Sequence, residues 1–485
     1  MLSWIVFVPV LGAALLAAVP ESAGRGIFRW GWVGITALDL LLVVLAWLGY
    51  DGGLAYEQHL RWIPSAGVGY HVGVDGLSLP LVAMTAVLFL ACAVHSLRRT
   101  HRVKAFALLF LLLETVSLGL FTALDLILFF VYFDLSIAVM YFVIAGWGRG
   151  AAKRSALTFF LYTFIGSLAL LLGFIGLALS ARPRTFDVLE LANSPTAGGW
   201  ALLAVCLGLA IKTPTVPFHT WLPPAHTDAP AAGSAILAGV LLKMGTYGFV
   251  RIAMPLLPAA WRDWAWLVVV VGVVSVLHGA LVALAQTDFK RMVAYTSVNH
   301  MGYVVLAVGA AGLATDAGPA SLAVTGAVTQ MVSHGLITAA LFLLAGVLHD
   351  RCGSYRMRDF GGLAGPAPVF AAATGLAAFA GLGLPGFSGF IAEFQIFTGS
   401  FASAPVATVL ALLGILITAG LFLRALHQVL TGPLRAPAPF TDLRPVESAS
   451  IVPLLVLVVL LGVLPRPLLD VIEPAAAALA GLVVR

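Results

Sequence analysis

Long apolar runs, separated by short polar segments, make up most of the 485-residue chain. We read these runs as about fourteen membrane spans, because an α-helix needs about 20 apolar residues to cross a bilayer. The predicted spans are 2–19, 28–48, 77–97, 104–121, 123–146, 156–180, 199–222, 231–255, 264–286, 292–313, 320–348, 367–401, 404–430 and 448–466. The C-terminal segment, from residue 468 onward, is too short and too rich in alanine to predict a further span.

Two of the predicted spans are broken. Four prolines between residues 214 and 224 interrupt the first, and proline cannot donate the backbone hydrogen bond that a regular helix needs. The sequence GLPGFSG at 383–389 interrupts the second, just before Glu393. Irregular backbone at membrane depth persists only where protein buries it or where it lines a wet cavity. Two broken spans in corresponding places of two halves are typical of an inverted-repeat transporter.

The order of the spans predicts how the chain is divided. Each broken span follows three full spans and precedes one, which indicates two inverted five-helix units. We therefore expect an all-α integral membrane protein of about fourteen helices, with helices 7 and 12 discontinuous. Its parts are three N-terminal helices (1–103), a first repeat (104–255), a second repeat (256–430) and a last helix with a tail (431–485). The division rests on hydropathy alone, since we see no residue-level repeat.

Composition agrees with a membrane protein. Hydrophobic residues make up 61% of the chain and charged residues 10%, whereas soluble domains carry about 25% charged residues. The net charge of +5 is small for this length, and the basic residues lie in short loops. We interpret them as a topology signal and expect no nucleic-acid partner.

The sequence shows no standard cofactor motif. Cys92, Cys206 and Cys352 stand alone, so the usual ligands of an iron–sulfur cluster or a structural zinc are missing. No two histidines or cysteines share a ligand spacing with a third group, so we predict no metal site. The glycines at 381, 383 and 386 have no strand–helix unit around them, and we predict no nucleotide site. We expect no cofactor on this chain.

The distribution of Lys and Arg predicts the orientation. Basic loops follow the first, third, fifth, ninth, eleventh and thirteenth spans, and all of them fall on one side if the span count is right. The loops at 50–75 and 312–319 fall on the other side and are nearly free of Lys and Arg. The basic loops should therefore face the cytoplasm and both termini the outside. The 181–198 loop is an exception, but Asp187 and Glu190 balance its two arginines.

Several ionisable residues lie inside apolar runs. Such residues are costly in a membrane and by default mark an ion or proton path. The alternative for a lysine is that it reaches the membrane surface from a helix end, but Lys212 and Lys243 each follow about ten apolar residues. We expect Lys212 to pair with Asp134, because a buried carboxylate needs a cation or a proton. The candidates for the path are Glu114, Asp134, Lys212, Lys243, Lys290, His300, His334 and Glu393.

Some of these candidates also have a structural explanation. Glu393 follows a break, where a helix dipole favours a carboxylate, and Lys290 is as consistent with an ordinary helix start. His300 and His334 each have a serine nearby and suit either a satisfied core histidine or a proton relay.

The positions of four polar residues predict further roles. Asp125 is expected to cap a helix, and Glu114 to be a second proton site. His219 and His226, on either side of Trp221, are expected to stabilise the broken segment by hydrogen bonds.

Long motifs in this chain resemble the antiporter-like membrane subunits of respiratory complex I. They include GVDGLSLPL at 73–81, LLLETVSLGLFTALDLILFFVYFD at 111–134, the whole of 211–248, ALVALAQTDFKRMVAYTSVNHMGYV at 280–304, SHG at 333–335, GLPGFSGFIAEF at 383–394 and LGVLPRPLLD at 461–470. The resemblance implies fourteen helices, inverted repeats at helices 4–8 and 9–13, and breaks in helices 7 and 12. It assigns Lys212 and Lys243 to the proton path and Glu393 to its exit side.

The helix-5 acid of that family falls at position 134. The family usually has Glu there, whereas this chain has Asp134, which is shorter by one C–C bond, or about 1.5 Å. The following LSIAVMYF also differs from the family's Met-Leu-Ile-Pro-Met pattern.

The resemblance also implies function and partners. It implies a proton-translocating subunit of an NADH–quinone oxidoreductase in a bacterial plasma membrane, without redox chemistry of its own. Other antiporter-like subunits and a redox arm that binds NADH, FMN, iron–sulfur clusters and quinone would be its partners. Three alternatives stay open: a subunit of a multisubunit cation/proton antiporter, a hydrogenase-linked assembly, and a scaffold whose polar residues only join helices.

Overall fold

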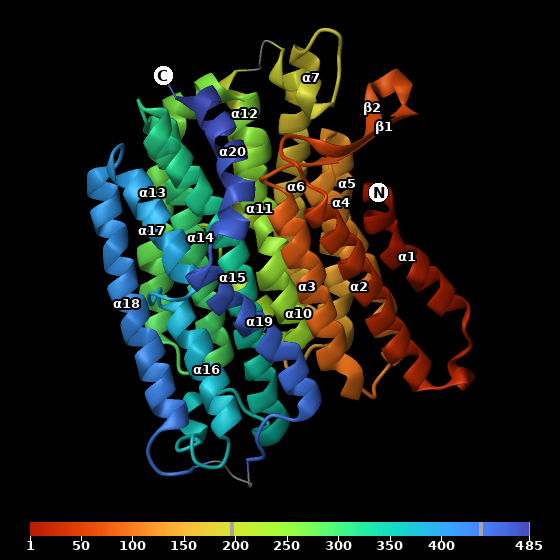
Figure 1. Cartoon of the computed structure of the whole chain (residues 1–485), viewed down its shortest axis with the longest axis vertical. Helices are drawn as coiled ribbons and strands as arrows, with labels where there is room; N and C mark the ends of the chain where they lie inside the picture. Colours follow the sequence, from red (N-terminus) through yellow and green to blue (C-terminus); the bar gives the residue numbers. More distant parts are fainter. Residues whose placement is uncertain (195–197, 436–439, 485) are drawn as a thin grey trace.

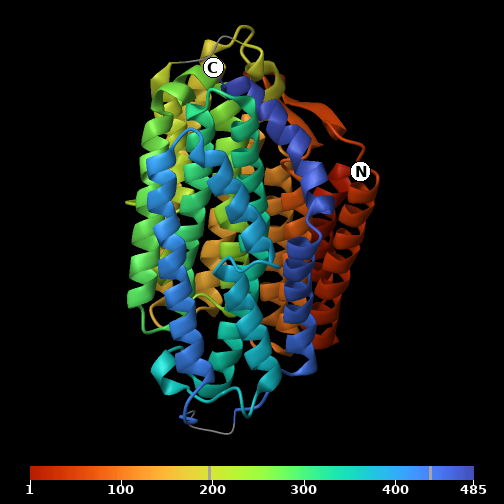
Figure 2. The same ribbon diagram turned by 60° about the vertical axis from the view of Figure 1, so that its left-hand side comes forward.

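The computed structural model describes residues 1–194, 198–435 and 440–484. Parts of the 181–198 loop and of the 431–485 segment lie outside these ranges. Every predicted span contains helix, and the helices run side by side along the long axis of the molecule (Figures 1 and 2). The N-terminal helices are α1 (Leu2–Ala18), α2 (Arg25–Leu48) and α3 (Leu79–His95).

The first predicted repeat contains three full helices, a broken one and a composite one. The full helices are α4 (Val103–Thr122), α5 (Leu126–Trp147) and α6 (Ala152–Ser180), followed by the short α7 (Val188–Ala192). The broken helix consists of α8 (Gly199–Lys212) and α9 (Leu222–Asp228). The composite helix consists of α10 (Ala231–Ile236), the π-helical turn η4 (Leu237–Leu241), α11 (Leu242–Gly248), the π-helical turn η5 (Phe249–Ala253) and α12 (Met254–Leu256).

The second predicted repeat shows the same order of elements. Three full helices come first: α13 (Pro258–Ala285), α14 (Phe289–Leu313) and α15 (Ala317–Cys352). The second broken helix consists of α16 (Pro368–Gly381) and α17 (Ser388–Phe401), and α18 (Pro405–Leu430) follows it. The inverted symmetry of the two units and the domain boundaries at 103, 255 and 430 stay predictions.

Ten of the described helices are long and apolar enough to cross a membrane, by length and composition. The other four predicted spans have identifiable reasons for falling short. Two are the broken helices, α1 has only 17 residues, and α14 carries polar side chains such as Asn299 and His300. The C-terminal helices α19 (Pro445–Val463) and α20 (Arg466–Val483) pack against α15, which is buried along nearly its whole length.

A β-hairpin forms within residues 50–75, where the sequence predicts only a loop. Strands β1 (Ala55–Ile63) and β2 (Val68–Val74) pair antiparallel, with His59 opposite His71. The hairpin projects at the end of the bundle that also carries α7, and both chain termini lie toward this end (Figure 1). Short 3₁₀ turns complete the chain at η1 (Glu21–Ala23), η2 (Pro64–Ala66), η3 (Ser96–Arg98) and η6 (Met357–Asp359).

Candidate functional site: a buried polar line

Lys212 is the last residue of α8, at the point where the first broken helix stops. The carbonyl end of a helix carries partial negative charge, which favours an ammonium group there. Its side chain is buried, donates to Ser136 Oγ at 3.1 Å and lies 4.7 Å from the ring centre of Phe133. The break therefore places an amine inside the bundle, against α5.

Asp134 lies on the same turn of α5 but does not contact Lys212 directly. Among the described residues, no ion pair joins the two side chains, although Asp134 interacts electrostatically with Lys212 and lies beside Ser167 of α6. Asp134 is also only half-buried, and its Oδ1 has no hydrogen-bond partner among the described residues. Asp134 and Lys212 therefore interact over a longer range than an ion pair, and the hydrogen-bond partner of the lysine is Ser136.

Lys243 lies between the two π-helical turns η4 and η5, where helix geometry is irregular. Turns of this kind are frequent at functional sites. The side chain is fully buried, and its Nζ donates to Ala238 O and to His334 Nδ1, at 2.6 Å each. Its two hydrogen-bond partners, a backbone carbonyl and an imidazole, are formally neutral. Because neither partner carries a fixed charge, a change of charge nearby acts strongly on the protonation of the Lys243 amine.

The two lysine-bearing segments touch at a glycine. A Cβ at Gly245 of α11 would lie 2.8 Å from the backbone nitrogen of Thr213, directly after Lys212. Real Cβ atoms do not approach that closely, so glycine is what lets α11 pack onto the end of α8.

A line of buried polar side chains leads from Lys243 toward the second break. His334 of α15 meets His300 of α14 edge to face, with ring centres 5.3 Å apart. The ring centres of His300 and Tyr303 are 6.1 Å apart, and Tyr303 interacts electrostatically with Glu393 of α17. The line therefore joins the composite helix of the first unit to the broken helix of the second.

Glu393, in the helix that follows the second break, is the last residue of the polar line. The carboxylate is buried, and a Cβ at Gly383, in the break, would collide with its Oε2. Gly383 has φ +75°, a conformation that glycine adopts without strain. Ser333 and Ser388 share a hydrogen bond of 2.7 Å across the same region, which ties α15 to the start of α17.

Lys290 is fully buried and reaches the C-terminal end of α9. Its Nζ donates to Ala229 O at 2.5 Å and Thr227 O at 3.3 Å. These bonds satisfy carbonyls that a helix end leaves free, which gives Lys290 a structural role at the junction of α9 and α10.

The two histidines around Trp221 differ from each other. His219 contacts His278, with Nε2 atoms 3.2 Å apart, as expected of a hydrogen-bonding residue. His226 was expected to do the same, and this is wrong: among the described residues neither of its ring nitrogens has a partner, and the ring stacks on Phe342 at 4.6 Å. Trp221 itself donates to Ile211 O at 3.0 Å, which folds the broken segment back onto α8.

Glu114 of α4 is fully buried, and the structure adds a partner that sequence reasoning missed. Asp39 of α2 is fully buried as well and interacts electrostatically with Glu114. No carboxylate oxygen of either residue has a hydrogen-bond partner among the described residues. Asp39 lies in the middle of the apolar run 28–48, so the rule that selected Glu114 would have found it.

Asp75 is a second residue that sequence reasoning missed, and it lies between β2 and α3. It accepts a 2.5 Å hydrogen bond from Arg251 Nη2, and Arg251 Nε donates to Tyr247 Oη at 2.8 Å. Burial by itself raises the pKa of Asp75, but the charge and hydrogen bond of Arg251 outweigh it, so the pKa is lowered from its ordinary value. The composite helix is thereby held to the end of β2.

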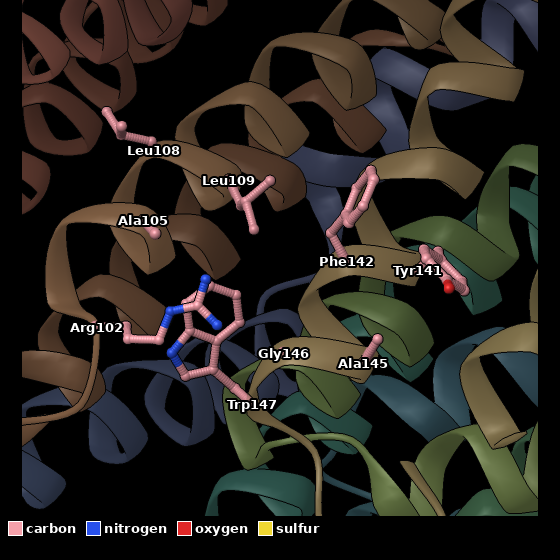
Figure 3. A pocket seen from close by; sticks show the side chains of 9 residues that line it. All are labelled: Arg102, Ala105, Leu108, Leu109, Tyr141, Phe142, Ala145, Gly146 and Trp147. Carbon is pink, nitrogen blue, oxygen red and sulfur yellow. The ribbon is translucent and has the colours of Figure 1, made fainter. Parts of the chain in front are cut away.

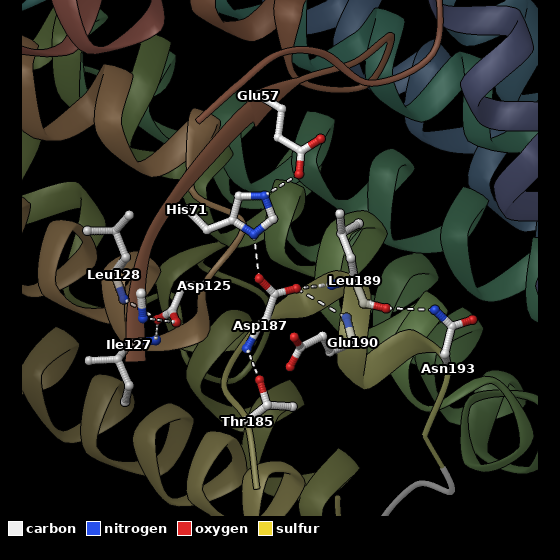
Figure 4. Close-up of polar contacts among 11 residues, drawn as sticks. Glu57, His71, Asp125, Ile127, Leu128, Thr185, Asp187, Leu189, Glu190 and Asn193 are labelled. Atoms are coloured by element: carbon white, nitrogen blue, oxygen red, sulfur yellow. Dashed lines mark hydrogen bonds and ion pairs between the residues drawn. The ribbon is translucent and has the colours of Figure 1, made fainter. Parts of the chain in front are cut away.

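A second polar network lies outside the spans, between the hairpin and α7 (Figure 4). His71 Nδ1 contacts Asp187 Oδ2, and Nε2 lies 2.9 Å from Glu57 Oε1. Burial lowers the pKa of His71, but the two carboxylates outweigh it and raise the pKa from its ordinary value. Asp125 was expected to cap a helix, which is confirmed: it accepts from the backbone of Ile127 and Leu128 at the start of α5.

A cavity that takes no part in the polar line lies elsewhere in the bundle. It measures about 560 Å³ and lies between α4 and α5, with Arg102 and Trp147 at one end and apolar side chains along the rest (Figure 3). None of the predicted path residues lines it.

Comparisons with known proteins place the chain in a family. The model of the NADH:quinone oxidoreductase/Mrp antiporter transmembrane family matches residues 123–418. NADH-quinone oxidoreductase subunit M of Rickettsia conorii is 37% identical over 445 residues, covering 90% of this chain and 88% of the relative. F(420)H(2) dehydrogenase subunit M of Methanosarcina mazei is 36% identical over 469 residues, covering 93% and 92%.

A solved structure agrees with these relatives over the whole chain. A chain of respiratory complex I from Thermus thermophilus with bound NADH superimposes with a TM-score of 0.91 and 31% identity, covering 100% of both chains. This likeness extends to the N-terminal helices and to α19 and α20, which the family model leaves out. The chain belongs to the NADH:quinone oxidoreductase/Mrp antiporter transmembrane family.

Proposed function

We propose that this chain is a subunit M-type, proton-translocating membrane-arm subunit of an NADH–quinone oxidoreductase. The observation that supports the proposal best is the buried line Lys243–His334–His300, continued by Tyr303 to Glu393. Each titratable member can take up and release a proton. Lys243 and His334 are joined by a hydrogen bond, and the later steps of the proposed path would run through bridging water molecules.

Coupling in this proposal is electrostatic. A change of charge near Asp134 alters the interaction of that carboxylate with Lys212, and Lys212 then acts on Lys243. Charges a few ångströms apart interact by several kcal/mol even at an effective dielectric constant of about 20. In this proposal, that interaction drives the proton from Lys243 through the histidines toward Glu393.

The proposal assigns no redox chemistry to this chain. NADH, FMN, iron–sulfur clusters and quinone would bind to partner subunits of the redox arm, and other antiporter-like subunits would flank this chain in the membrane. We also propose that both termini face the outside of a bacterial plasma membrane. The shared end of the two termini and the basic loops at the other end support this orientation.

The test uses the intact complex in proteoliposomes. Proton uptake driven by NADH and quinone is measured per NADH oxidised, for the native protein, for Lys243→Ala and for Lys153→Ala, an exposed lysine outside the line. We expect Lys243→Ala to lose most of its pumping while the complex still assembles, and Lys153→Ala to keep it. Full pumping by Lys243→Ala would refute the assignment.

A second candidate differs in the electron donor. The similarity to a subunit M of an F(420)H(2) dehydrogenase favours a related assembly that oxidises a donor other than NADH. Purified membranes that pump protons with reduced F420 and not with NADH would support it. Sodium-dependent proton exchange without any electron donor would instead support the cation/proton antiporter.

A further inference from the structure

The hairpin end of the molecule gathers metal-ligand side chains that are far apart in the sequence. His59 lies on β1, His71 on β2 directly opposite, and Asp187 at the start of α7. One ligand atom from each of the three lies within 4.8 Å of the others. Sequence spacing predicts no such site, because 116 residues separate His71 from Asp187.

The arrangement has the features of a metal site. The two imidazoles stack with ring centres 4.5 Å apart and planes inclined by 16°. Asp187 commits Oδ1 to the backbone of Leu189 and Glu190 and directs Oδ2 at His71 (Figure 4). That carboxylate is therefore held in place by α7, with one oxygen available to a ligand or a proton.

Glu57 supplies the outer partner that metal-binding histidines usually have. A ligating imidazole commonly donates its second ring N–H to a carboxylate, which fixes its tautomer and orientation. The 2.9 Å contact between His71 Nε2 and Glu57 Oε1 provides this, and leaves Nδ1 on the side of Asp187.

An ion can reach the cluster from outside. A cavity of about 320 Å³ opens beside the hairpin and is lined by both His59 and Asp187. Two further carboxylates, Asp125 and Glu190, line it together with Arg61 and Arg184. His59 is exposed and free to adjust its side chain, so separations of up to 4.8 Å can shorten to the roughly 3.3 Å expected around a tetrahedral ion with bonds of about 2.0–2.1 Å.

We propose that His59, His71 and Asp187 bind one Zn²⁺ ion at the hairpin, with Glu57 as a positioning residue for His71 and water in the fourth position. Two imidazoles and a carboxylate suit zinc and do not suit Mg²⁺, which prefers oxygen ligands. The ion would replace the direct contact between His71 Nδ1 and Asp187 Oδ2. The ion would connect the hairpin to α7. The proposed zinc site does not depend on the proposed proton translocation.

The test is calorimetric titration of the chelator-treated full-length protein in detergent with ZnCl₂ and, separately, MgCl₂. The variants are His59→Gln and Glu57→Gln, both at exposed or partly exposed positions. His427→Gln is the control, an exposed histidine on α18 outside the cluster. We expect one Zn²⁺ per chain, no Mg²⁺ binding, and affinity lowered by about ten- to a hundredfold in both cluster variants and unchanged in the control.

Absorption by Co²⁺ gives a second readout. Tetrahedral Co²⁺ bound to the native protein should absorb strongly in the visible region, and His59→Gln should lose most of this band. Absence of saturable Zn²⁺ binding, or equal affinities for His59→Gln and His427→Gln, would overturn the proposal. In that case His71 serves only as a hydrogen-bonded link between Asp187 and Glu57.

Discussion

Lys243 donates a 2.6 Å hydrogen bond to His334, across the boundary between the two predicted repeats. Both side chains are buried, and the bond connects the composite helix α10–α12 to α15. A proton on either group therefore changes the proton affinity of the other. Transfer between these two groups is the central step of the proposed path.

The first prediction concerns that bond. His334→Ala removes the acceptor and should reduce pumping by the intact complex to near the uncoupled background, because Lys243 loses its neighbour on the path. His334→Gln keeps an acceptor but cannot relay a proton, so it should assemble normally and still pump poorly. Proton uptake per NADH oxidised measures both, and native-like pumping by His334→Gln would show that the histidine acts only as a hydrogen-bond partner.

The second prediction concerns the break that carries Glu393. Gly383→Ala puts a Cβ against the carboxylate and should reduce pumping by displacing Glu393. Gly386→Ala is the matched control, because Gly386 also has a positive φ, +97°, but nothing within 4 Å of its Cβ position. Both should lose about 1–2 kcal/mol of stability from backbone strain, and only Gly383→Ala should lose pumping. Equal pumping by the two variants would contradict the proposed role of this contact.

The third prediction concerns the helix-5 acid. Asp134→Asn removes the charge that acts on Lys212 and should lower pumping without preventing assembly. Asp134→Glu lengthens the side chain by about 1.5 Å, so it should keep or increase pumping by bringing the carboxylate nearer to the lysine. A Glu variant that behaves like the Asn variant would indicate that the shorter acid is required in this chain.

The fourth prediction concerns the ion pair of Asp75 and Arg251. Asp75→Asn leaves Arg251 without its partner and should cost about 3 kcal/mol of stability. The exposed pair Arg466–Asp470 gives the control, since Asp470→Asn should change the midpoint of thermal unfolding very little.

The pH dependence of the same variant follows from the lowered pKa of Asp75. A carboxyl group whose pKa is lower in the folded state than in the unfolded state stabilises the fold above its unfolded pKa of about 3.9, and this stability is lost as the pH falls through the folded value. The difference in unfolding temperature between native protein and Asp75→Asn should therefore be greatest near neutral pH and shrink below about pH 4. A difference that stays constant over this range would contradict the assignment.

Hydropathy, proline and glycine placement were enough to predict the fourteen helical spans, the breaks in two of them and the burial of Lys212, Lys243 and Glu393. These features depend on local chemistry: apolar length decides whether a helix spans a membrane, and proline removes a backbone donor wherever it stands. The same reasoning could have identified Asp39, which lies in an apolar run like the other buried acids.

Only the tertiary structure decided which side chains meet. It gave Lys212 a hydrogen bond to Ser136, joined Lys243 to His334 from 91 residues away, and brought His59, His71 and Asp187 together at the hairpin. The physical reason is that hydrogen bonds require heavy atoms about 3 Å apart, whereas a hydropathy pattern only identifies which segments are buried. Depth in the membrane can be predicted from the sequence of this chain, but the partners at that depth depend on how its helices pack.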